Sequence, residues 1–87
     1  MKLELKKFGT TLSSRPSAKE AWASTQAYIL NDLKPNEKIE LDFAGVEVLT
    51  PSWADEFIFA LKTKYPKQVI LLPSDNKSVQ ISLEFVK

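Results

Sequence analysis

The side chains that could do chemistry in this chain are hydroxyls, carboxylates, lysines and a single arginine. The sequence contains no cysteine and no histidine. Their absence removes thiolate nucleophiles, disulfides, imidazole metal ligands and the usual general base near neutral pH. The candidates that remain are Arg15 and a group of polar and aromatic residues between Asp42 and Phe59.

Asp42, Asp55 and Glu56 are the carboxylates that could suggest a metal site or an acid–base pair. Asp55 and Glu56 are adjacent in a predicted helix, about 100° apart around its axis, so they are not expected to converge on one ion. Asp42 lies at the end of a predicted strand, where it could pair with Arg15 or cap backbone amides. We therefore predict no metal site, no cofactor and no catalytic residue, and a protein that is not an enzyme.

Arg15 stands just before a predicted helix. Its guanidinium could hold Asp42 or Asp55 in a bidentate pair and tie one helix to the entrance of the next. The alternative is that Arg15 binds a phosphate group on a ligand or a partner. In that case the chain would be a small-molecule or phosphate-binding module with a pocket near Arg15 and Asp42.

A typical helix start signal is formed by Thr50, Pro51 and Ser52. Thr50 or Ser52 is expected to be the N-cap, Pro51 the first helical residue, and Asp55 the acid that caps in return. The alternative is a regulatory phosphate on Thr50 or Ser52, which the positive end of the helix dipole would stabilise. Capping is favoured, because Asp55 and Glu56 already supply negative charge to that turn.

Aromatic residues on the helix that follows indicate a contact surface. The apolar residues expected to face the sheet are Ala54, Phe57, Ile58, Leu61 and Tyr65. Phe59 falls roughly 150° from the centre of that stripe, beside Asp55 and Lys62, and Trp53 lies at its margin. An outward Phe among polar residues is typical of a protein contact. We predict that Trp53 and Phe59 contact a protein partner or a second copy of the chain.

Composition limits the other function classes. The chain has 87 residues, 44% apolar and 26% charged, which predicts one domain over residues 1–87. A formal net charge of +1 provides no broad field for nucleic acid or anionic lipid. No apolar run approaches the ~20 residues of a membrane span. Together with the lack of cysteine, these features predict a cytoplasmic protein that binds neither nucleic acid nor membrane.

The elements that must position these residues follow from apolar spacing. Alternation predicts strands over residues 3–8 and 38–43. A helix is predicted from Ser17, which forms a capping pattern with Glu20, as far as Pro35. The residues that would form its buried stripe are Ala18, Trp22, Thr25, Ile29 and Leu33.

The second half of the chain continues the alternation of helix and strand. A helix is predicted over residues 52–65, ended by Pro66. Residues 68–72 are a continuous apolar run of the kind found in the middle of a parallel sheet. Residues 78–86 fit a strand or a helix. The alternation implies right-handed crossovers and an α/β fold with a mostly parallel sheet.

The strand that ends in Asp42, the turn at Gly45 and the run T-P-S-W-A-D-E at residues 50–56 resemble the regulatory STAS domains of bacterial anti-sigma-factor antagonists. The chain looks most like the small STAS-like domains of unknown function. The resemblance is carried by residues 12–15 and 41–56, and more weakly by residues 74–79. It implies a small STAS-like α/β domain, with helices packed on a mixed, mostly parallel sheet, and a helix at residues 78–86.

In anti-sigma-factor antagonists, an Asp-Ser pair begins the corresponding helix, and a partner kinase phosphorylates the serine. The aligned residues here are Thr50 and Pro51, with Ser52 one residue further on. Because Pro51 has no hydroxyl, the resemblance does not extend to that phosphorylation. It implies a non-enzymatic regulatory module that binds a protein, such as a kinase-like ATPase, through this helix start.

Overall fold

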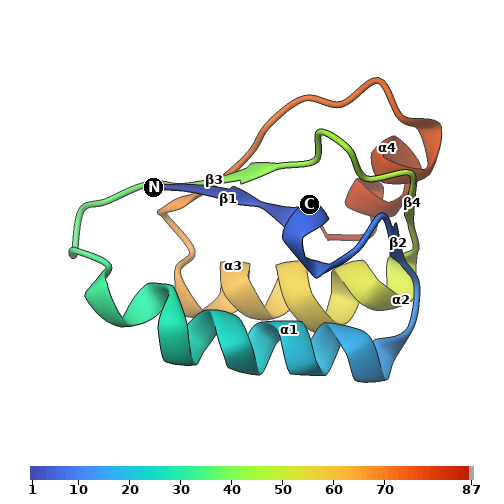
Figure 1. Cartoon of the computed structure of the whole chain (residues 1–87). Coiled ribbons are helices and arrows are strands. Elements are labelled where there is room, and N and C mark those ends of the chain that lie inside the picture. Colours follow the sequence, from blue (N-terminus) through green and yellow to red (C-terminus); the bar gives the residue numbers. More distant parts are fainter. Residues whose placement is uncertain (87) are drawn as a thin grey trace.

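Three parallel strands form the main sheet of the computed structural model, which describes residues 1–86. β1 (Lys2–Glu4), β3 (Ile39–Asp42) and β5 (Val69–Leu71) lie in the order β1-β3-β5. α1 (Arg15–Tyr28) and α3 (Ala60–Lys64) run beneath this sheet (Figure 1). The predicted α/β fold with a mostly parallel sheet is confirmed.

The N-terminal strand is shorter than its pattern predicts. Only residues 2–4 are extended, and a 3₁₀ turn follows at Leu5–Phe8. The turn still buries Leu5. Alternation of Leu3 and Leu5 therefore identifies two core residues but not the backbone between them, because a 3₁₀ turn can also direct such a pair inward.

A second sheet, which the sequence did not suggest, consists of β2 (Thr11–Leu12) and β4 (Val48–Leu49), paired in parallel. These strands are too short to show a period. Each leads directly into a helix, β2 into α1 and β4 into α2 (Pro51–Ala54). Because the two strands are parallel, the two helices begin at the same end of the molecule.

α1 begins three residues earlier and ends earlier than predicted. Its N-cap is Ser14, whose side chain accepts a hydrogen bond from the backbone N–H of Ser17, so the predicted cap at Ser17 is wrong. The helix ends at Tyr28, and a 3₁₀ turn at Leu30–Asp32 replaces the turns expected before Pro35. Of the predicted stripe, Ala18 and Thr25 are buried, and the larger residues are partly buried against the core.

The second predicted helix is one continuous run, here called the central helix, over residues 51–64. It consists of α2, a π-helical turn at Asp55–Phe59, and α3. The residues that it buries completely are Trp53, Ala54, Phe57, Ile58 and Leu61. The predicted inward stripe is thus confirmed except for Tyr65, which follows the last turn and is partly buried.

β5 lies at an edge of the sheet, and the prediction that its apolar run occupies the middle is wrong. β3 has the central place instead, with Ile39 and Leu41 fully buried. Residues 68–72 have no charged side chain, yet β5 pairs only with β3 in the described part of the chain.

The last segment is a helix, α4 (Lys77–Glu84), as the family resemblance implied. Asn76 caps it by accepting a hydrogen bond from the N–H of Val79. Two serines on α4 then reach the edge of β4. Ser78 Oγ accepts from the N–H of Leu49 at 3.1 Å, and Ser82 Oγ donates to its carbonyl at 2.6 Å. None of the helices in residues 1–86 is long and apolar enough to cross a membrane.

Candidate functional site

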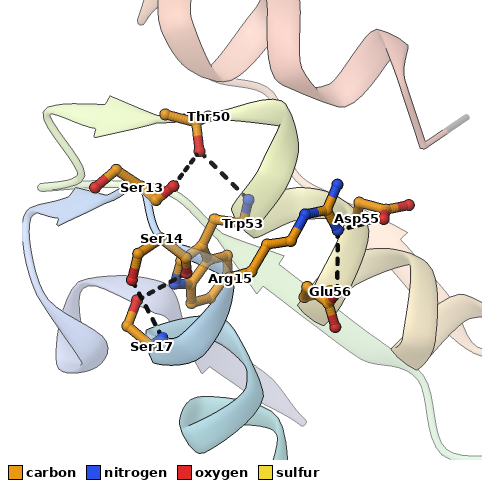
Figure 2. A network of polar contacts seen from close by, with 8 residues as sticks. All are labelled: Ser13, Ser14, Arg15, Ser17, Thr50, Trp53, Asp55 and Glu56. Carbon is orange, nitrogen blue, oxygen red and sulfur yellow. Dashed lines mark hydrogen bonds and ion pairs between the residues drawn. The ribbon is translucent and has the colours of Figure 1, made fainter.

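The starts of α1 and the central helix lie side by side and form the candidate site (Figure 2). Ser13 and Ser14 lead from β2 into α1, and Thr50 leads from β4 into the central helix. The backbone N–H of Thr50 donates to the carbonyl of Leu12 at 3.0 Å, which extends the pairing of the two strands up to the helix starts.

Thr50 is the N-cap of the central helix, as predicted. Its Oγ1 accepts from the backbone N–H of Trp53 at 3.3 Å and donates to the carbonyl of Ser13 at 2.9 Å. Pro51 occupies the first helical position, where its missing N–H costs no hydrogen bond. Ser52 makes no cap in the described structure, so of the two predicted candidates only Thr50 has that role.

Arg15 reaches from the start of α1 to the π-helical turn of the central helix. Its Nη1 donates to Asp55 Oδ2 at 2.8 Å and to Glu56 Oε1 at 3.0 Å. The predicted pair with Asp55 is confirmed, but it is not bidentate, because one guanidinium nitrogen binds one oxygen of each carboxylate. The hydrogen bonds that Arg15 donates to Asp55 and Glu56 raise the pKa of Arg15 above its ordinary value, so the guanidinium is charged at any physiological pH.

The two carboxylates have a different role from the one predicted. Asp55 is not the reciprocal capping acid of this helix start, because its side chain is turned toward Arg15. Asp55 and Glu56 also meet on one cationic nitrogen, although consecutive residues lie about 100° apart around a helix axis. The longer side chain of Glu56 bridges the angle that separates them. Sequence reasoning missed Glu56 as a partner of Arg15.

Asp42 is held apart from this cluster. Its Oδ1 accepts from the backbone N–H of Ala44 at 3.0 Å, and its Oδ2 lies 3.4 Å from Lys2 Nζ. The hydrogen bond from Ala44 lowers the pKa of Asp42, and Lys2 adds to that effect. Arg15 and Asp42 share no partner, so the arrangement does not favour a ligand pocket between them. Within residues 1–86, no three acidic side chains come together in a way that could hold a metal ion.

Trp53 belongs to the core, and its predicted place in a contact surface is wrong. Its side chain is 1% exposed. The ring stacks on Phe57 with centroids 4.8 Å apart, and Phe8 covers it at 6.3 Å. Helical phase placed Trp53 at the margin of the stripe. Trp53 is nevertheless buried, because the 3₁₀ turn that contains Phe8 packs over that margin.

Phe59 points outward, as predicted, with 54% of its side chain exposed. It lines an open groove of about 560 Å³ between α1 and the central helix. The residues that line this groove are Trp22, Gln26, Asp55, Glu56, Phe59, Ala60, Thr63 and Lys64. Sequence reasoning did not identify Trp22 as a residue of this groove. It was expected on the buried stripe of α1, and it contacts Phe57 edge-on at 5.9 Å while one side remains open to the groove.

A comparison with known protein families supports the fold. A family model described as a STAS-like domain of unknown function matches residues 27–84. The match includes the whole central helix and α4, and it begins after Arg15. Neither the curated proteins nor the solved structures contain a significant match.

Proposed function

Because this chain belongs to the family of STAS-like domains of unknown function, we propose that it is a non-enzymatic regulatory module that binds a partner protein. The contact surface consists of the start of the central helix together with the groove beside Phe59. By analogy with anti-sigma-factor antagonists, the partner is a regulatory protein such as a kinase-like ATPase. The absence of cysteine favours a cytoplasmic setting for the pair.

The observation that carries this proposal is the exposure of Phe59 at the groove. The central helix buries its large apolar residues against the sheet, whereas Phe59 leaves about half of its ring in water beside the partly open face of Trp22. Neither ring surface is needed for the domain's own core. Aromatic side chains in such positions often supply most of the binding energy of a protein interface.

The polar edge of the groove indicates the chemistry of the partner. Asp55 and Glu56 lie along one side, and each is partly exposed. Arg15 neutralises part of their charge and holds both carboxylates in place. A partner with an apolar anchor for the groove and a lysine or arginine beside it would fit this edge.

The structure also bears on regulation by phosphate. The Thr50 hydroxyl makes two hydrogen bonds, one within its helix and one to Ser13. A phosphate on Thr50 would break its donation to Ser13 and disturb the helix start. Asp55 and Glu56, further along the same helix start, would also repel it. We therefore propose that partner binding does not depend on phosphorylation of Thr50.

The proposal is tested by affinity capture from the native cell with three forms of the chain: wild type, Phe59→Ala and Tyr28→Ala. Tyr28 is the matched control, because it is an aromatic residue on α1 with 82% of its side chain exposed and it does not line the groove. We expect wild type and Tyr28→Ala to capture the same protein and Phe59→Ala to lose it. Equal capture by all three forms would show that the groove is not the contact surface.

A further inference from the structure

The two edges of the main sheet differ in their chemistry. At one edge, β1 presents the charged side chains of Lys2 and Glu4, and Lys2 pairs with Asp42. At the other edge, β5 lies within the uncharged run of residues 68–72. Charged residues are a common protection of sheet edges against pairing with another chain. β1 has this protection and β5 does not.

The composition of β5 is that of a strand with neighbours on both sides. Ile70 is 40% exposed, while Val69 and Leu71 are only partly buried. Continuous apolar strands of this kind normally lie inside parallel sheets. The mismatch between the sequence of β5 and its place at an edge indicates that another strand covers it.

The hydrogen bonds to β3 show which backbone groups of β5 are available. The carbonyl of Gln68 accepts from Ile39 at 2.7 Å, and the N–H of Leu72 donates to Leu41 at 3.0 Å. Gln68 and Leu72, which flank β5, therefore direct these backbone groups toward β3. Because these directions alternate along a strand, the N–H and C=O groups of Val69 and Leu71 point to the open edge. In the described part of the chain, no other strand pairs with them.

We propose that β5 pairs antiparallel with β5 of a second copy of this chain, about a two-fold axis at Ile70. The main sheet then continues through both subunits in the order β1-β3-β5-β5-β3-β1. Val69 of each copy exchanges both backbone hydrogen bonds with Leu71 of the other, and Ile70 lies opposite itself as a non-hydrogen-bonded pair.

This register follows from the ends of the strand. An axis at Val69 would pair Leu71 with Lys67, which lies in the turn before β5. An axis at Leu71 would place Val69 opposite Pro73, which has no N–H to donate. An axis at Ile70 uses every outward N–H and C=O group of Val69 and Leu71. Pro73 then ends the pairing on one side. In this register only apolar residues and Gln68 come to face each other between the two strands.

Charge favours a second copy over an unrelated strand. Lys67 precedes the apolar run and Asp75 follows it, and both are exposed. Lys67 lies in the turn before β5 and Asp75 in the loop after it, so antiparallel pairing about Ile70 places the Lys67 end of one copy beside the Asp75 end of the other, twice by symmetry. Parallel pairing would instead bring Lys67 beside Lys67 and Asp75 beside Asp75 of the other copy. The edge of β5 is therefore complementary to itself in hydrogen bonding and charge.

The dimer is independent of the proposed function. β5 belongs to the sheet, whereas Phe59 belongs to the helical layer, so both surfaces can be occupied at once. Few residues pair across the axis. We expect a dissociation constant on the order of micromolar or weaker, because small interfaces form weak complexes.

Sedimentation velocity over a concentration series tests the proposal. We expect wild type to shift from monomer to dimer, and Ile70→Lys to stay monomeric because it places two ammonium groups at the axis. The matched control is Val48→Lys, at a strand residue with 39% exposure in the other sheet, which should dimerise like wild type. Circular dichroism shows whether each variant is folded. A wild type that stays monomeric throughout, or an Ile70→Lys that dimerises normally, would overturn the proposal.

A charge exchange tests the register without changing an apolar residue. Lys67→Glu and Asp75→Lys should each weaken self-association at least several-fold, because each places like charges together twice. An equal mixture of the two variants should form a heterodimer of near wild-type affinity, since residue 67 of each variant then lies beside an opposite charge at residue 75 of the other. Failure of the mixture to associate would contradict the antiparallel register.

Phe59→Ala separates the two proposals. It should keep the dimer intact while it loses the partner protein. If Phe59→Ala abolished the dimer instead, self-association would use the groove, and the assignment to β5 would be wrong.

Discussion

The hydroxyl of Ser82 donates a 2.6 Å hydrogen bond to the backbone carbonyl of Leu49, from a helix to the edge of a strand. Ser78, one turn earlier on α4, accepts from the N–H of the same residue. Together the two serines satisfy the backbone groups of Leu49 that a further strand would otherwise pair. α4 thereby closes the edge of β4, whereas the edge of β5 has no such cover among the described residues.

Ser82→Ala should lower the free energy of unfolding by about 1–3 kcal/mol, because it leaves the buried carbonyl of Leu49 without its donor. Urea denaturation measures the change. Ser74→Ala is a suitable control, since Ser74 is also a serine near α4 and its Oγ accepts from the N–H of Asn76 in a more exposed turn. Equal effects of the two substitutions would show that Ser82 has no special role.

Thr50→Ala should destabilise the domain by about 0.5–2 kcal/mol, the usual cost of losing an N-cap side chain. Ser52→Ala is the matched control and should change the midpoint of denaturation little, because Ser52 makes no cap. If Ser52→Ala were the more damaging substitution, the assignment of the cap to Thr50 would be wrong.

Trp53→Ala and Phe59→Ala should have opposite consequences, although the residues are six positions apart on one helix. Removing the buried Trp53 ring should cost about 3–5 kcal/mol, since it leaves a cavity against Phe8 and Phe57. Phe59→Ala should leave stability nearly unchanged. Thermal unfolding of both variants checks this contrast, and a strongly destabilised Phe59→Ala would place that ring in the core.

Asp42 should contribute stability that depends on pH in a defined direction. The hydrogen bond from the backbone N–H of Ala44 and the pair with Lys2 lower the pKa of Asp42 below its ordinary value. A carboxylate whose folded pKa is depressed contributes stability that is fully present above its unfolded pKa and is lost as pH falls through the folded value.

Asp42→Asn should therefore be less stable than wild type at pH 7, and the difference should shrink as the pH is lowered from about 5 toward 2. Urea titrations at several pH values measure this convergence. A difference between the two proteins that stays constant over that range would show that ionisation of Asp42 does not contribute.

Much of the fold could be predicted from local sequence. The inward face of the central helix and the outward direction of Phe59 follow from 3.6 residues per turn, which neighbouring residues alone set. The cap at Thr50 follows for the same reason, because an N-cap bonds to an N–H only a few residues away. The central strand β3 shows its alternation clearly, since one of its faces is buried.

Features that depend on residues distant in sequence could not be predicted in this way. Trp53 is buried because Phe8, from near the N-terminus, packs over it. Glu56 and Asp55 both bind Arg15, because the start of α1 places Arg15 beside the turn that carries them. The apolar run of β5 has the pattern of a central strand, but strand order is decided by the path of the crossovers. Local periodicity reports which way a side chain faces within its own element, and only tertiary packing decides what meets it there.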